Sequence, residues 1–226
     1  MTTEPDFDAA LARADAAVRE GRTLNGTGFW PVVARLRANS VLAVRYGERV
    51  ADIDRRAFER AVRVRVRIGV GVPLLVAGTA AGVLGLVVAA GLGDVLQAIV
   101  FGIAFVLLVV STHSLGHYVV GRLAGIRFTH AFVAGRPPEP GVKVDYASYL
   151  RATPKTRAVM HASGALVTKI VPFALVPVVF AMDAWPGLGW ILIAFGAIGI
   201  VTDVAFSTKT SDWMRVKREL RAGRGL

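Results

Sequence analysis

The sequence predicts an all-α integral membrane protein with four transmembrane helices, a cytoplasmic N-terminal helical region and a short β-hairpin between spans 2 and 3. Three observations predict this class. Hydrophobic residues make up 54% of the 226-residue chain. They gather in four blocks, each close to the roughly 20 residues that cross a bilayer. The charged residues, whose formal excess is +11, fall between the blocks except for Lys169 and Asp203.

The four apolar blocks define the predicted spans. The first carries no charge, and because it follows an Arg-rich region it is not a cleaved signal peptide. The third contains Pro172 and Pro177, which membrane helices tolerate. We therefore expect a basic helical region at 1–67 and a basic tail at 207–226. The membrane domain, 68–206, has expected spans at about 68–90, 97–121, 158–182 and 187–206.

Short amphipathic patterns predict structure outside the spans. Phe7, Leu11, Ala14 and Val18 share one face of a helix that stops before Gly21. The other expected elements are a helical stretch opened by Trp30-Pro31, an Arg-dense stretch 53–67 that runs into the first span, hairpin strands 125–133 and 142–147, and a helix 211–220 capped by Ser211 or Asp212.

The basic residues sort by loop and predict the topology. Residues 1–67, 122–157 and the tail hold every Lys and Arg except Lys169, whereas the turns 91–96 and 183–186 hold none. By the positive-inside rule both termini are expected to be cytoplasmic. The expected membrane is a prokaryotic cytoplasmic membrane. The bilayer is then the expected partner of the basic surface, and nucleic acid is not. Without cysteine, disulfides and thiolate metal sites are excluded, so any metal must use His and carboxylates.

Ionisable side chains inside the spans are costly and usually mark function. Counting about 1.5 Å per helical residue, His113, His117, His161 and Asp203 fall in one layer on the cytoplasmic side. The i, i+4 spacing of His113 and His117 puts both imidazoles on one helix face, as a zinc site requires. Asp203 is the expected third ligand. The alternative is that these histidines hydrogen-bond hydroxyls or carbonyls between helices.

Lys169 lies near the predicted midplane, where an ammonium group needs a partner. We expect it to pair with Asp203, in which case Lys169 and zinc would compete for one carboxylate. The alternative is that Lys169 borders a small water-filled cavity.

The stretch from Ser111 to Phe128, with His113-Ser-Leu-Gly-His117, resembles the HExxH span of site-2 protease-type intramembrane zinc metalloproteases. The stretch from His161 to Thr168 stands where that family has a Gly-Pro-x-x-Asn helix. The resemblance covers about residues 97–206 and implies that His113, His117 and Asp203 hold zinc.

The sequence departs from this family at its catalytic position. Ser114 replaces the glutamate, and a serine hydroxyl is a poor base near neutral pH. Glu139, in the expected hairpin, is the best outside candidate for that base. We favour a weakly active or inactive homologue that binds transmembrane partners. The alternatives are an active protease that cleaves a membrane-anchored substrate, and a small proton or ion transporter-like protein.

Overall fold

The computed structural model describes residues 4–135, 138–205 and 211–223. The chain forms two compact units, and each is drawn from separate stretches of sequence. The helix–sheet unit comprises Met1–Ile68, Gly121–Ala158 and Arg218–Leu226; the bundle unit comprises Gly69–Val120 and Val159–Lys217. This interleaving differs from the linear division expected from hydropathy.

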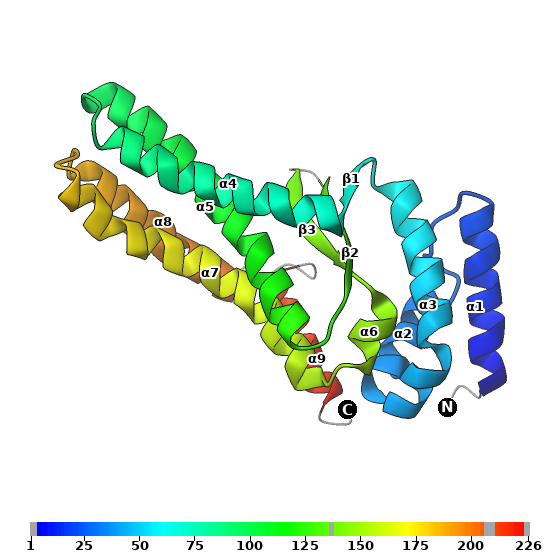
Figure 1. Ribbon diagram of the computed structural model, residues 1–226. Coiled ribbons are helices and arrows are strands. Elements are labelled where there is room, and N and C mark those ends of the chain that lie inside the picture. Colours follow the sequence, from blue (N-terminus) through cyan, green and yellow to red (C-terminus); the bar gives the residue numbers. More distant parts are fainter. Residues whose placement is uncertain (1–3, 136–137, 206–210, 224–226) are drawn as a thin grey trace. The chain divides into compact units, whose positions relative to one another are not determined.

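Three helices build the first part of the helix–sheet unit (Figure 1): α1 (Glu4–Arg19), α2 (Phe29–Ala38) and α3 (Ser40–Ala61). The predicted apolar face of α1 is buried, with Leu11 wholly enclosed. Asn39 caps α3, because its side-chain oxygen accepts a hydrogen bond from the backbone N–H of Leu42 at 3.0 Å. Phe29 and Ile53 complete an ordinary apolar core.

The expected hairpin is present as part of a three-stranded antiparallel sheet. Its order is β1 (Val64–Arg67), β2 (Phe128–Ala134) and β3 (Glu139–Val144). The Arg-dense stretch 53–67 does lead into the first span, but the expected helical region 1–67 is not helical to its end, because α3 ends at Ala61 and Val64–Arg67 is a strand. The alternating Val-Arg-Val-Arg has a period of two, which suits a strand, and it pairs with β2 from Val64↔Val133 to Arg67↔His130.

A buried ionic cluster ties the C-terminal part of the chain to the helix–sheet unit. Glu219 lies on α9 (Asp212–Ala222), and its Oε2 accepts a hydrogen bond from Nε of Arg157 at 2.6 Å. The Tyr149 hydroxyl, on α6 (Tyr146–Arg151), donates to the other carboxylate oxygen at 2.8 Å. The side chains of Arg157 and Glu219 are only 1% and 0% exposed, so both charges depend on these partners.

Four helices form the bundle unit: α4 (Ile68–Ala89), α5 (Asp94–Leu123), α7 (Pro154–Ala181) and α8 (Gly187–Ala205). Three of them, α4, α5 and α7, are long and apolar enough to cross a membrane. The apolar stretch of α8, Gly187–Asp203, is shorter. The four helices match the predicted spans closely in sequence, whereas a fourth crossing stays a prediction.

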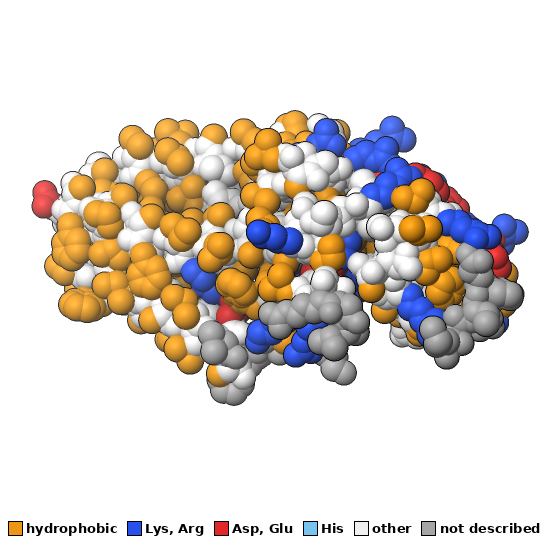
Figure 2. All heavy atoms as spheres, turned by 90° about the horizontal axis from the view of Figure 1, so that it is seen from below, with side chains coloured by type: hydrophobic (Ala, Val, Ile, Leu, Met, Phe, Trp, Pro, Cys, Tyr) orange, Lys and Arg blue, Asp and Glu red, His pale blue; other side chains and the backbone are white. Residues whose placement is uncertain are grey.

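The bundle has an apolar exterior and closely packed helices. Hydrophobic side chains cover the face of the helices seen in Figure 2, with few charges among them. Inside, α4 and α5 approach so closely that a Cβ at Gly82 would lie 2.7 Å from Cγ of Leu108. Such close packing is typical of small residues spaced four apart, as Gly78 and Gly82 are.

Candidate metal centre

Helix α5 carries the two histidines that the sequence singled out. His113 and His117 are one turn apart, and their ring centroids are 4.7 Å apart with the rings nearly perpendicular. His117 is buried and His113 is half-buried. The i, i+4 spacing therefore produces the predicted pair, with both rings on one face of the helix.

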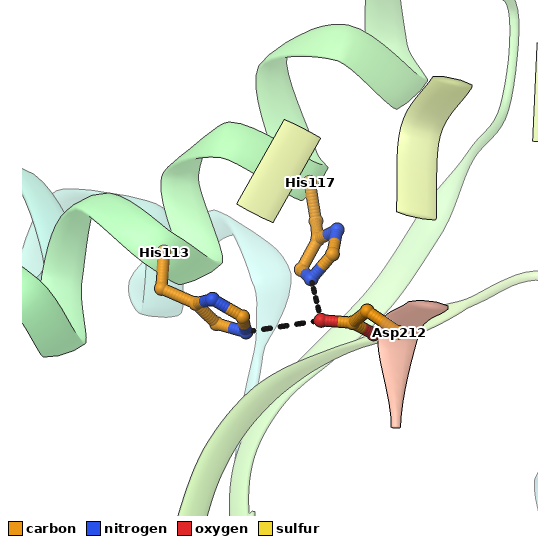
Figure 3. Close-up of side chains that lie close together, drawn as sticks. All are labelled: His113, His117 and Asp212. Carbon is orange, nitrogen blue, oxygen red and sulfur yellow. Dashed lines mark hydrogen bonds and ion pairs between the residues drawn. The ribbon is translucent and has the colours of Figure 1, made fainter. Parts of the chain in front are cut away.

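A carboxylate from the first turn of α9 completes the group (Figure 3). Oδ2 of Asp212 lies 3.1 Å from Nε2 of His117 and 3.5 Å from Nε2 of His113. His113, His117 and Asp212 each offer one ligand atom, and the three atoms lie within 4.8 Å of one another. These residues could hold a metal ion.

The other ring nitrogen of each histidine has an acceptor. Nδ1 of His117 lies 2.8 Å from the carbonyl oxygen of Met160. Nδ1 of His113 lies 2.8 Å from Oγ1 of Thr168, whose own proton goes to the carbonyl of Gly164 at 3.0 Å. A carbonyl can only accept, so both Nδ1 atoms must be the donors. Metal-binding histidines usually have such a partner, which leaves Nε2 with a lone pair.

Three acceptor atoms therefore converge where the rings meet the carboxylate. Acceptors at this distance repel one another unless a cation or a proton lies among them. Ligand atoms of a tetrahedral zinc, at bond lengths of about 2.0–2.2 Å, lie about 3.3–3.5 Å apart. The two nitrogen–oxygen separations here are 3.1 and 3.5 Å. The donor set and these two separations fit a divalent metal such as zinc.

Helix α7 leaves room for the His117 ring at a glycine. A Cβ at Gly164 would lie 2.3 Å from Nε2 of His117. No residue with a side chain fits at this position. On the facing helix, a Cβ at Gly116 would lie 3.3 Å from the carbonyl oxygen of Ser163. These two glycines let α5 and α7 approach, so the backbone itself forms one wall of the metal group.

The chain around Asp212 keeps its carboxylate ionised and turned toward the rings. Ser211 caps α9 by accepting a hydrogen bond from the Met214 backbone N–H at 3.3 Å, so Asp212 is not needed as the cap. Arg215 donates to the other oxygen, Oδ1, at 3.1 Å. Burial by itself raises the pKa of Asp212. When a proton takes the place of the metal between Nε2 of His117 and the carboxylate, that hydrogen bond and charge, with the Arg215 charge, lower the pKa of Asp212 to about 2.

Asp203, the carboxylate expected as third ligand, has different neighbours. Its Oδ2 lies 2.9 Å from Nζ of Lys169, which confirms the predicted ion pair. The same oxygen accepts a hydrogen bond from Nε1 of Trp213 at 3.1 Å. Lys169 and the histidines thus have separate carboxylates, so the expected competition for one carboxylate has no basis in this arrangement.

The remaining predicted site residues lie at different places. The ring centroid of His161 is 6.3 Å from that of His117, at the edge of the metal group. Ser114 is wholly buried, and its hydroxyl has no hydrogen-bond partner among the residues that the structure describes. Glu139 is an exposed residue of β3 in the helix–sheet unit.

No family model, curated protein or solved structure matches this chain. The geometry of the site is therefore the main indication of function. Sequence reasoning missed Asp212 because Ser211-Asp212-Trp213 has the pattern of a helix cap beside an interfacial tryptophan. The available signal was that Ser211 alone could cap the helix, which would leave a second carboxylate just beyond the last apolar block.

Proposed function

We propose that this chain is a four-span membrane protein whose bundle holds one zinc ion through His113, His117 and Asp212. The observation that carries the proposal is the convergence of two imidazole Nε2 atoms and one carboxylate oxygen, with both Nδ1 atoms already committed as donors. Three protein ligands leave a fourth tetrahedral position for water or another group, as in catalytic zinc sites.

The proposed topology has both termini and the 122–157 segment in the cytoplasm. The charge distribution supports it, since all Lys and Arg except Lys169 lie in 1–67, 122–157 and the tail. The short apolar stretch of α8 is offered as the fourth span, because short spans are accommodated by local thinning of the bilayer.

The proposed activity follows the resemblance to site-2 protease-type metalloproteases, with Asp212 rather than Asp203 as the carboxylate ligand. A bound zinc would supply Lewis-acid chemistry and lower the pKa of bound water. Peptide hydrolysis also needs a general base, typically worth about 10²–10⁴-fold in rate. At the glutamate position the chain has Ser114, so we propose a weakly active or inactive homologue that binds transmembrane partners.

Metal content tests the proposal. The full-length protein, purified in detergent without chelator, should contain about one zinc per chain. His113→Ala, His117→Ala and Asp212→Asn should each lose it. His130→Ala on β2 is the matched control, because it removes a histidine from the other unit. Zinc-free wild type, or equal loss in the His130 variant, would overturn the proposed site.

A second experiment tests whether the proposed site lacks only its general base. Ser114→Glu restores the residue type that a general base requires, so hydrolysis of a membrane-anchored reporter should rise by about 10²–10⁴-fold. Ser114→Gln has the same size without the basic group and should stay at the wild-type level. Wild type that cleaves as fast as Ser114→Glu would contradict the assignment as a weak or inactive protease.

A further inference from the structure

The bundle contains a second polar cluster, formed by Lys169 on α7, Asp203 on α8 and Trp213 on α9. Its ion pair is shielded, since the side chains of Lys169 and Asp203 are 19% and 29% exposed. Helix α8 makes room for the ammonium group at Gly199, where a Cβ would lie 3.2 Å from Nζ of Lys169. Gly199 therefore leaves the space that the Lys169 ammonium group occupies.

One carboxylate oxygen joins all three helices of this cluster. Oδ2 of Asp203 accepts from Nζ of Lys169 at 2.9 Å and from Nε1 of Trp213 at 3.1 Å. Hydrogen bonds in which one partner is ionised are about twice as strong as neutral ones. The indole of Trp213 is thus held by a charged acceptor on α8, although α9 begins only after residues 206–210, which are not described.

The two clusters are adjacent along both helices. On α7, Thr168 accepts from His113, and the next residue, Lys169, pairs with Asp203. On α9, Asp212 faces the histidines, and the next residue, Trp213, donates to Asp203. Helix α9 therefore places one residue in the metal group and the next in the Lys169–Asp203–Trp213 cluster, and α7 places a hydrogen-bond partner of His113 directly before Lys169.

We propose that the Lys169–Asp203–Trp213 cluster is a positioning network that fixes the first turn of α9, so that Asp212 meets His113 and His117. Lys169, Asp203 and Trp213 are positioning residues and not ligands. The inference rests on the proposed zinc site and extends it to the residues that set its affinity. Outer contacts that orient metal ligands typically change metal affinity by 10–100-fold when removed.

A purely structural role would have a different signature. An ion pair that only offsets the cost of burying Lys169 would change the stability of the bundle and leave zinc affinity alone. Removal of the Trp213 N–H would then have no effect on metal, because the ion pair persists without it. The indole donor is therefore the most informative atom to remove.

The test compares Trp213→Phe with Trp190→Phe, an exposed tryptophan on α8, as the matched control. Zinc affinity is measured on full-length protein in detergent by competition with a chromophoric chelator, and the thermal midpoint of the metal-free form is recorded. We expect Trp213→Phe to bind zinc about 10-fold more weakly with an unchanged metal-free midpoint, and Trp190→Phe to match wild type. Cobalt substitution should give an altered visible spectrum in Trp213→Phe alone.

Asp203→Asn is the second variant and serves if Trp213→Phe does not fold. It keeps the size of the side chain and removes its charge. It should weaken zinc binding by about 10–100-fold. Wild-type affinity and an unchanged cobalt spectrum in these variants would overturn the positioning network and leave the zinc site intact. Zinc-free wild type would overturn the zinc site itself and the network with it.

Discussion

The helix–sheet unit and the bundle unit both enclose apolar side chains, but they expose different kinds of side chain. In the helix–sheet unit, large apolar residues such as Phe29 and Leu36 are enclosed. In the bundle, Ile198 and Trp190 are 61% and 71% exposed, whereas the polar Ser114 is enclosed. An apolar exterior is stable only in an apolar solvent. The two units of one chain are thus built for two different surroundings.

The two units also differ in how they hold charge. The Arg157–Glu219 pair is almost fully enclosed and has several further hydrogen bonds, including the Tyr149 hydroxyl. The side chains of Lys169 and Asp203 are partly exposed, and Asp203 also accepts a hydrogen bond from Trp213. The first arrangement suits a permanent structural contact. The second is adjacent in sequence to Asp212 on α9 and to Thr168, the partner of His113, on α7, which suits the positioning role proposed above.

The largest expected effect is on the enclosed pair. Glu219→Ala leaves the Arg157 guanidinium buried without its counter-charge, which should cost about 3–5 kcal/mol in the free energy of unfolding of the helix–sheet unit. Urea unfolding in detergent micelles measures it. Glu48→Ala, which removes an exposed partner of Arg151, should change little. Equal effects of the two variants would contradict the structural role of Glu219.

The next effect tests whether the two exteriors face different solvents. Val76 on α4 and Val41 on α3 are both exposed, at 52% and 75%. Val76→Lys should cost about 3 kcal/mol of membrane insertion, and Val41→Lys should be neutral in water. The fraction of protein that resists carbonate extraction from membranes measures this. Equal extraction of both variants would show that α4 does not face lipid.

The smallest effect compares one carboxylate from each unit, the buried Asp54 and the half-buried Asp212. Burial raises the pKa of Asp54, although Lys143 opposes it. The pKa of Asp212 is lowered to about 2, because its partners outweigh burial. An acid with a raised folded-state pKa binds more protons when folded, so its contribution to stability falls as pH rises; a lowered pKa gives the reverse.

Wild type should therefore gain stability over Asp212→Asn by about 2 kcal/mol as pH rises from about 2 to 5, measured on metal-free protein. Over Asp54→Asn, it should lose stability as pH rises above about 4. If both stability differences change with pH in the same direction, the pKa values of the two carboxylates are not shifted in opposite directions.

Local patterns predicted most of the helices and two of the three proposed ligands. Apolar blocks of suitable length predicted α4, α5 and α7, and the i, i+4 spacing predicted the pair of His113 and His117. The Lys169–Asp203 pair also followed from the cost of a lone ammonium. The strand β1 was missed because Val-Arg alternation next to a helix becomes a strand only when β2, more than sixty residues later, offers its edge.

The sequence by itself determined which segments are apolar enough for a membrane, which helix carries the imidazole pair, and that Lys169 needs an acid. These depend on composition and helical period, which are local properties. The tertiary structure alone decided that Asp212 joins the histidines while Asp203 joins Lys169 and Trp213. The two acids are nine positions apart in sequence, and only the packing of α9 against α5, α7 and α8 determines which of them each partner meets.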